Sequence, residues 1–225
     1  MSLNVFIIIP AYNEASVIGD VIDGLLPLAH TIVVVDDGSK DETAKAARRH
    51  GAVVLSHCTN IGQGAALQTG IEYARLCNAD VVVTFDADGQ HQPVDIPVLL
   101  NALERKNVDV VLGSRFLGAA HGLRRFRKML LKLMVQYTNI TAGMRLTDAH
   151  NGLRALRMAT TGRISIKQNR MAHASELLQQ IAKYKLRYVE VPCTIIYTPY
   201  SLAKGQKLSN SINILADLFL RRLHK

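Results

Sequence analysis

Short runs of Val and Ile alternate with amphipathic segments through the first half of the chain. Continuous β-branched runs are typical of strands buried on both faces, and strand–helix alternation is typical of a parallel sheet covered by helices on both sides. The strands expected from this pattern are 5–9, 31–35, 53–55, 81–85 and 108–112. The helices expected between them are 14–26, 39–50, 64–76 and one that begins at Pro93. We therefore expect an α/β fold with a Rossmann-like, mostly parallel sheet.

The alternation is looser after Gly113. The elements expected there are a mobile loop 116–123, a basic helix 124–142, a short strand 153–156, a helix 174–185, a strand 187–197, a loop 199–207 and an amphipathic helix 211–223. A chain of 225 residues is the size of one domain with an extension. We predict a single domain over 1–225, made of a half 1–115 and a half 116–225 that ends in the amphipathic helix.

Charge and composition limit the class of partner. The net charge of +9 indicates an anionic partner, and only 5% of residues are aromatic, with no Trp. Without a stacking platform or a nucleic-acid motif, an anionic membrane surface or a polyphosphate substrate is favoured over nucleic acid. No apolar stretch reaches the roughly 18 residues of a membrane helix. Three scattered cysteines and no leader pattern predict a cytoplasmic protein with reduced, buried thiols.

Two aspartates follow the fourth predicted strand. Asp86 and Asp88 are one residue apart, so in an extended segment their side chains point the same way. Two converging carboxylates repel each other unless a cation lies between them, and hard oxygen ligands suit Mg²⁺ or Mn²⁺. The alternative is a solvated loop whose Asp caps the next helix.

Polar loops also follow the first three strands, where open α/β sheets bind ligands. In the first loop, Pro10 could end the strand and Asn13 cap a helix, or the backbone could meet a planar base and Glu14 a ribose hydroxyl. In the second, capping needs only Ser39, so the two aspartates before it exceed what a turn requires. The third, 60–64, resembles part of a dinucleotide fingerprint, but Leu67 replaces the third glycine, which disfavours NAD.

Taken in order, these loops resemble a known family. PAYNE, VVDDGS and FDADGQHQP, followed by Gly113-Ser114-Arg115, Thr147-Asp148 and the segment 151–155, are similar to family 2 glycosyltransferases with the GT-A fold. The closest resemblance is to the branch of dolichol-phosphate mannose synthase and related polyprenyl-phosphate sugar transferases. It covers about residues 3–200. It implies that 1–115 binds a nucleotide sugar and that 116–225 forms an acceptor-side extension.

The resemblance also implies roles for single residues. The nucleotide-binding set would be Pro10, Ala11, Tyr12, Glu14, Asp37, Gly64, Asp86, Ala87 and Asp88. The metal ligands for Mg²⁺ or Mn²⁺ would be Asp86, Asp88 and Gln90. The acceptor or phosphate set would be Arg115, Arg124, Arg125, Arg127 and Lys204. Arg115 and Asp148 would be catalytic, with Asp148 either a base or an orienting group. Leu202 stands where the family often has Arg, so Lys204 or Lys207 could supply that phosphate contact.

The implied activity is metal-dependent, inverting transfer of a sugar from a UDP-, GDP- or dTDP-sugar. The acceptor would be a polyprenyl phosphate or a lipid-linked glycan at the cytoplasmic membrane face, with peripheral attachment to an anionic surface. The apolar faces of 124–142 and 211–223 could also pair subunits. The alternatives are a sugar nucleotidyltransferase, whose usual glycine- and lysine-rich loop is missing here, and a non-catalytic nucleotide-sugar-binding protein.

Overall fold

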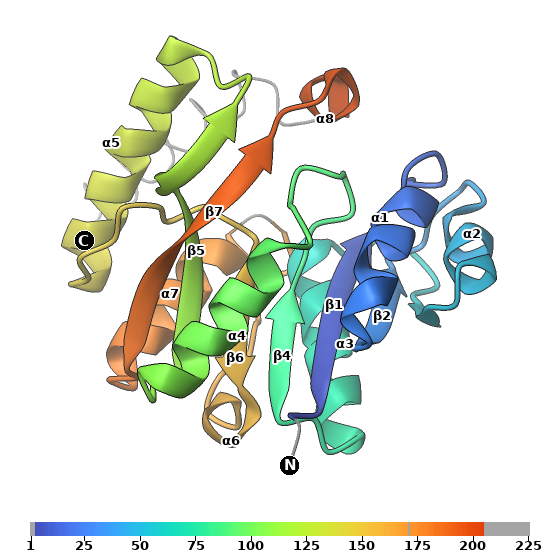
Figure 1. The fold of residues 1–225 in the computed structure, drawn as a ribbon, viewed down its shortest axis with the longest axis horizontal. Helices are drawn as coiled ribbons and strands as arrows, with labels where there is room; N and C mark the ends of the chain where they lie inside the picture. The colour runs from blue at the N-terminus through green and yellow to red at the C-terminus, as the bar shows by residue number, and fades with distance from the viewer. Residues whose placement is uncertain (1–2, 171, 205–225) are drawn as a thin grey trace.

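The computed structural model describes residues 3–170 and 172–204 (Figure 1). A seven-stranded sheet with the order β3-β2-β1-β4-β6-β5-β7 runs through this part of the chain. Its strands are β1 (Val5–Ala11), β2 (Thr31–Asp36), β3 (Val53–Ser56), β4 (Val81–Thr84), β5 (Val110–His121), β6 (Arg154–Arg157) and β7 (Tyr188–Ile196). Only β6 is antiparallel to its neighbours, β4 and β5. The expected α/β class with a mostly parallel sheet is confirmed.

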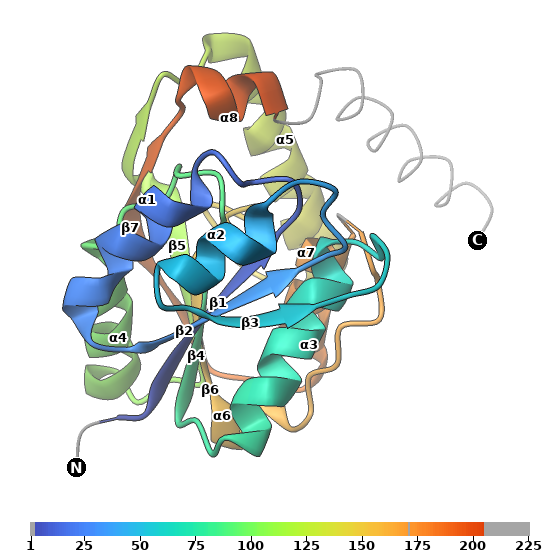
Figure 2. The ribbon, with the colours of Figure 1, turned by 90° about the vertical axis from the view of Figure 1, so that its right-hand side faces the viewer.

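Helices cover both faces of this sheet (Figures 1 and 2). They are α1 (Ile18–Leu25), the 3-10 helix η1 (Leu26–Leu28), α2 (Thr43–Arg49), α3 (Gln63–Leu76), α4 (Asp95–Arg105), α5 (Arg125–Ala142), α6 (Met158–Thr161), α7 (His173–Lys183) and α8 (Pro199–Lys204). Helices α1, α2 and α4 pack on one face, and α3 and α7 pack on the other. The strand–helix alternation in the sequence thus produces the two-sided layering that it predicts.

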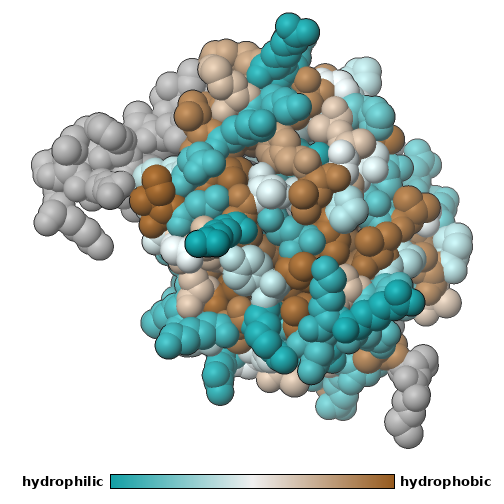
Figure 3. Space-filling view, turned by 60° about the vertical axis from the view of Figure 1, so that its left-hand side comes forward, coloured by the Kyte–Doolittle hydropathy of each residue, from teal (hydrophilic) through white to brown (hydrophobic). Residues whose placement is uncertain are grey.

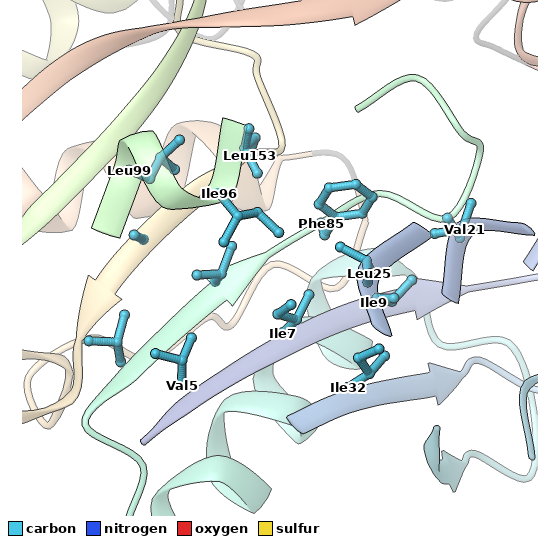
Figure 4. Packing of buried hydrophobic residues seen from close by; sticks show 14 of the residues in the cluster. Val5, Ile7, Ile9, Val21, Leu25, Ile32, Phe85, Ile96, Leu99 and Leu153 are labelled. Atoms are coloured by element: carbon cyan, nitrogen blue, oxygen red, sulfur yellow. The ribbon is translucent and has the colours of Figure 1, made fainter. Parts of the chain in front are cut away.

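Alternation along β1 divides the core between the two faces. Ile7 and Ile9 point to the face where Leu25 of α1 lies, and Figure 4 shows them gathered with their neighbours there. Ile8 points to the opposite face and packs against α3, where a Cβ on Gly70 would collide with it. Each fully buried Ile of this kind contributes about 1.5–3 kcal/mol. The first strand is therefore anchored on both sides, which fixes the position of the loop that follows it.

Two segments predicted to be loops are regular structure. The prediction of a mobile loop at 116–123 was wrong for most of that range, because β5 continues to His121 and pairs with β7. The register between these strands shifts between Ser114 and Ala119, and the two glycines of the segment concealed the strand. The segment that begins at Pro199 is helical to Lys204, so the loop prediction was wrong there too. The predicted helix 211–223 and residues 205–207 lie outside the described residues.

Other predictions need smaller corrections. Ser39 does not cap α2, which begins at Thr43, because its hydroxyl accepts the N–H of Asn13 instead. The three cysteines are free as expected, but Cys58 and Cys77 are exposed and only Cys193 is buried. Within the described residues, no helix combines the length and the apolar character needed to cross a bilayer.

The fold brings distant segments to one edge of the sheet. The parallel strands β1, β2, β3 and β4 end on the same side, and the long strands β5 and β7 continue past them toward α5 (Figure 1). After β7 the chain returns through α8 to the loop that follows β1 (Figure 2). Segments from both halves of the chain therefore meet at this edge.

Candidate active site

A cavity of about 690 Å³ opens at this edge of the sheet. The first half of the chain contributes the lining residues Pro10, Ala11, Tyr12, Glu14, Asp37, Asn60, Gly62, Gln63, Ala66, Asp86, Ala87, Asp88, Gln90 and His91. Arg115, at the end of the first half, and the second half contribute the remaining lining residues, Arg115, Arg127, Leu130, Leu131, Met134, His150, Gly152, Arg170, Ile195, Tyr197 and Lys204. The carboxylates lie in the first group and the arginines in the second, so the cavity has an acidic and a basic side.

Most of the residues singled out from the sequence line this cavity, and four do not. Gly64 donates its N–H to the carbonyl of Asn169, and a Cβ on it would collide with the neighbouring segment, so its smallness serves packing. Asp148 lies buried behind Arg115. Arg124 and Arg125 are exposed outside the cavity.

Side chains from the second loop hold the first loop. The N–H of Asn13 donates to Ser39 Oγ at 2.9 Å, and the N–H of Glu14 donates to Thr43 Oγ1 at 2.8 Å. In return, Asn13 Oδ1 accepts the N–H of Lys40 at 2.8 Å. The Glu14 side chain is therefore presented to the cavity by a backbone that is fixed from two directions.

Asp37 organises the third loop. Its Oδ1 accepts the N–H of Ile61 at 3.0 Å and its Oδ2 accepts the N–H of Gly62 at 2.7 Å. Oδ1 also contacts His57 Nδ1 at 2.8 Å, so both oxygens have partners within the protein. Asp37 thus links the loop after β2 to the start of α3, where backbone N–H groups can receive an anion.

The acidic side consists of two carboxylates with different partners. Asp86 accepts Gln63 Nε2 at 3.1 Å and contacts His91 Nε2 at 2.9 Å. Asp88 accepts both the backbone N–H (3.1 Å) and the side-chain amide (2.6 Å) of Gln90. The Cα of Gly152 packs on the Asp86 carboxylate, and a Cβ there would collide with both of its oxygens.

Asp86 and Asp88 have pKa values that differ from each other, because their surroundings differ. Burial, followed by the charge of Asp86, raises the pKa of Asp88 to about 6. Burial also opposes ionisation of Asp86, but attraction to His91 and the contact with it outweigh burial and lower its pKa. A positive charge placed between two such carboxyls would favour the ionised form of both.

The donor set fits a hard divalent cation. Asp86 and Asp88 offer carboxylate oxygens, and Gln90, whose side-chain amide contacts Asp88, carries an amide oxygen as a further hard donor. Among the described residues, no three His, Cys, Asp or Glu side chains form a metal-binding group. Mg²⁺ and Mn²⁺ sites typically have only a few protein ligands when a substrate phosphate completes the coordination.

A buried ion pair fixes the basic side. Arg115 Nε donates to Asp148 Oδ2 at 2.6 Å, and its other nitrogens donate to Tyr197 Oη at 2.7 Å and to the carbonyl of His150 at 2.9 Å. Burial disfavours a charge on Arg115, but Asp148 and Tyr197 compensate and raise the pKa of the guanidinium. Asp148 Oδ1 accepts the N–H of His150, so both carboxylate oxygens are occupied. The Asp148 side chain is only 1% exposed.

Helix α5 forms an apolar wall beside Arg115. Leu130, Leu131 and Met134 line the cavity, and Arg127 extends over the Tyr197 ring with 5.2 Å between its Cζ and the ring centroid. Of the basic cluster identified in the sequence, only Arg127 therefore faces the cavity. Helical periodicity turns Arg125, two residues earlier, to the outer surface.

The sequence analysis missed two side chains of the site. Gln63 contacts Asp86, and Tyr197 contacts Arg115 and Arg127. Each could have been found from its position, because Gln63 opens the helix after the third strand and Tyr197 directly follows β7. The short strand expected at 153–156 is β6, and its antiparallel direction, which the sequence did not reveal, brings buried Arg154 beside β4.

Two comparisons with known sequences identify the family of this chain. The sequence profile of glycosyl transferase family 2 matches residues 6–164. A UDP-N-acetylglucosamine–dolichyl-phosphate N-acetylglucosaminyltransferase from Methanococcus voltae is 32% identical over 98% of this chain and 97% of its own. An undecaprenyl-phosphate mannosyltransferase from Micrococcus luteus is 32% identical over 86% of this chain and 84% of its own.

A solved structure shows the same fold. Glucosyl-3-phosphoglycerate synthase from Mycobacterium tuberculosis, in complex with Mn²⁺ and UDP-glucose, superposes with a TM-score of 0.74 at 20% identity, covering 98% of this chain and 79% of the other. The profile match and the two relatives confirm the resemblance that the strand-end loops predict. The chain is an enzyme that belongs to glycosyl transferase family 2.

Proposed function

We propose that this protein transfers a sugar from a nucleoside-diphosphate sugar to a polyprenyl phosphate, with Mg²⁺ or Mn²⁺, at the cytoplasmic face of a membrane. The observation that carries the proposal is the division of one cavity into the Asp86–Asp88 pair on one side and Arg115 with Arg127 on the other. Such a cavity can hold a metal-bound diphosphate next to an anionic acceptor.

The donor would occupy the acidic side. The backbone of Pro10 and Ala11 would meet the base, and Glu14, with Tyr12 beside it, would receive the ribose. The loop that Asp37 organises would face the diphosphate through the start of α3. A cation held by Asp86, Asp88 and Gln90 would stabilise the negative charge that develops on the departing diphosphate. The Methanococcus voltae relative is named for a UDP-sugar donor, and the solved neighbour is in complex with Mn²⁺ and UDP-glucose, which supports this arrangement.

The acceptor would occupy the basic side. Arg115 and Arg127 can contact a phosphate, and Leu130, Leu131 and Met134 can contact the first isoprene units behind it. Two relatives act on dolichyl phosphate and undecaprenyl phosphate, according to their names. A phosphate is already ionised near neutral pH, so its oxygen can attack the anomeric carbon without a base.

Asp148 would then be a positioning residue for Arg115. Its carboxylate has partners on both oxygens and does not line the cavity. Attack from the acceptor side, opposite the departing diphosphate, would invert the configuration at the anomeric carbon. A lipid-linked glycan, whose hydroxyl needs a base, would be a poorer acceptor for this arrangement.

Helix α5 would attach the enzyme to the membrane. Phe126, Met129, Leu133 and Ile140 are 55%, 53%, 55% and 68% exposed. At 3.6 residues per turn, these four side chains project within an arc of about 60°. An apolar row of this kind on an exposed helix is typical of a surface that inserts at the lipid interface.

Basic residues border this row. Arg125, Lys128 and Lys132 are exposed on the adjoining side of α5, where they can contact anionic headgroups. Figure 3 shows apolar and strongly hydrophilic residues side by side on this flank of the molecule. An adjoining face of α5 lines the cavity, so attachment through the outer row would bring the acceptor side of the cavity to the headgroup level. The same row could instead pair two subunits.

The donor and metal parts of the proposal can be tested by thermal unfolding. UDP, GDP and dTDP, each with Mn²⁺ or with EDTA, should be compared, because a ligand that binds only the folded state raises the melting temperature. We expect one of them to stabilise the protein only with Mn²⁺, and Asp88→Ala to abolish the effect. No response to any nucleotide would contradict the proposal. Formation of a nucleoside-diphosphate sugar and pyrophosphate from a sugar 1-phosphate and a nucleoside triphosphate would favour the nucleotidyltransferase alternative.

A further inference from the structure

Side chains of helix α8 form hydrogen bonds with the loop that follows β1, although the two segments are far apart in the sequence. Tyr200 Oη donates to Glu14 Oε2 at 2.7 Å, and Lys204 Nζ lies 2.8 Å from Glu14 Oε1. Lys204 Nζ also donates to the carbonyl of Tyr12 at 2.9 Å and to that of Asn13. Both oxygens of Glu14 are therefore held by side chains from the last described helix.

We propose that Tyr200 is a positioning residue of the donor site, which orients Glu14 to receive the ribose hydroxyls of the nucleotide. This inference rests on the proposed function, because it assumes that Glu14 is the ribose ligand. It adds a residue that neither the sequence motifs nor the cavity lining includes. It also gives α8 a role in recognising ribose.

The geometry indicates that Tyr200 positions Glu14 and does not block the nucleotide site. Glu14 and Lys204 line the cavity, whereas Tyr200 does not, so the Tyr200 hydroxyl reaches the carboxylate from outside the space that a nucleotide would fill. Each carboxylate oxygen can accept two hydrogen bonds. One bond from Tyr200 and one from Lys204 leave an acceptor site on each oxygen, which suits the two neighbouring hydroxyls of a ribose.

The Glu14 carboxylate needs hydrogen-bond partners because it is buried. The Glu14 side chain is only 10% exposed, and its own backbone is fixed through Thr43. The terminal carboxylate can still rotate about its last side-chain bond, and a buried carboxylate without partners is unfavourable. Tyr200 and Lys204 satisfy the charge and select one orientation before any donor arrives. A pre-oriented group loses less entropy when it binds its ligand.

The test is Tyr200→Phe, which removes only the hydroxyl. Binding of UDP and GDP with Mn²⁺ should be compared with binding of 2′-deoxy-UDP and 2′-deoxy-GDP by calorimetry. We expect the variant to bind the ribonucleotide roughly 3- to 10-fold more weakly, mainly through the lost hydrogen bond to Glu14, and to lose part of the preference over the deoxy form. The longer hydrogen bond that the Tyr200 hydroxyl accepts from Lys204 Nζ, at 3.3 Å, is lost as well. In transfer assays the donor KM should rise by a similar factor, and kcat should change little.

Two further variants complete the design. In a Glu14→Gln background, Tyr200→Phe should have little additional effect, because Tyr200 acts through Glu14. Tyr184→Phe, which changes a tyrosine on another part of the surface, should bind like the wild type.

Each other outcome contradicts the inference. Tighter binding by Tyr200→Phe would show that α8 blocks the site, and equal weakening of ribo- and deoxynucleotides would show a purely structural role. If the wild type binds none of these nucleotides, the proposed function is wrong and this inference falls with it. If the wild type binds and Tyr200→Phe binds equally well, only the inference is wrong.

Discussion

At the scale of single residues, the site depends on charges that the protein itself orients. Arg115 is held by a carboxylate, a phenol and a carbonyl before any substrate is present. Burial raises the pKa of Asp88, and His91 helps to lower the pKa of Asp86. Such preorganised charges do not need to reorient when negative charge shifts during the reaction.

Replacing Asp148 tests the buried ion pair. Asp148→Asn keeps the shape but leaves Arg115 without its counter-charge, so we expect the free energy of unfolding to fall by about 3 kcal/mol in urea titrations. Asp109→Asn is the matched control, because its partner Arg187 is 59% exposed, and it should cost about 1 kcal/mol or less. In the pH–rate profile, Asp148→Asn should lower kcat while the acidic limb stays where it is in the wild type. Loss of that limb would identify Asp148 as the base.

His150 predicts a pH dependence of stability. Burial lowers the pKa of His150 to about 4, so the unfolded chain takes up its proton near the ordinary value of 6.5 while the folded protein does not. The free energy of unfolding should therefore fall by up to ~3 kcal/mol as the pH drops from 6.5 to 4. His150→Asn should flatten this part of the curve, and His121→Asn, at an exposed site, should not. Identical curves for His150→Asn and the wild type would contradict this account.

At the scale of elements, the sequence predicts the first half better than the second. Strands β1, β2, β3 and β4 are continuous Val and Ile runs that end at polar loops, and both features are local. In β5, the outer residues 116–121 form a strand because β7 pairs with them, and no local pattern encodes that partner. The direction of β6 likewise depends on its place between β4 and β5.

The same distinction applies to the site. Nearly all of the predicted nucleotide and metal residues line the cavity, because they follow directly from strand ends. The sequence alone could not tell which arginine of the basic cluster faces the cavity, because the direction of Arg127 depends on how α5 packs. It also could not place Tyr200 next to Glu14, because that contact depends on the path of the chain after β7.

The outer row of α5 gives an element-scale prediction. Phe126→Ser with Leu133→Ser should reduce binding to vesicles that contain anionic lipid roughly 10-fold or more, because two exposed apolar side chains no longer insert. Nucleotide binding should be unchanged. Leu76→Ser is the control, since Leu76 is 82% exposed at the end of α3 that points away from the cavity. The measurement is vesicle co-sedimentation at low and high salt, and wild-type affinity in the double variant would contradict the attachment.

At the scale of the whole molecule, one sheet connects the donor and acceptor sides. Strands from both halves lie in a single sheet, and α8 returns from its far end to the first loop. The distance between the acidic and basic sides is therefore fixed by the fold, which suits a reaction between two anionic substrates that must be held together. Positioning of this kind can supply a large share of a barrier reduction.

The most direct test of the account is transfer of a radiolabelled sugar to undecaprenyl phosphate in anionic vesicles. UDP- and GDP-sugars should be supplied with Mn²⁺ or with EDTA. We predict metal-dependent formation of a lipid-soluble sugar phosphodiester from one donor, reduced at least 100-fold by Asp88→Ala, which removes a metal ligand. Transfer that persists in EDTA, or that occurs to a lipid-linked glycan but not to the polyprenyl phosphate, would contradict the account.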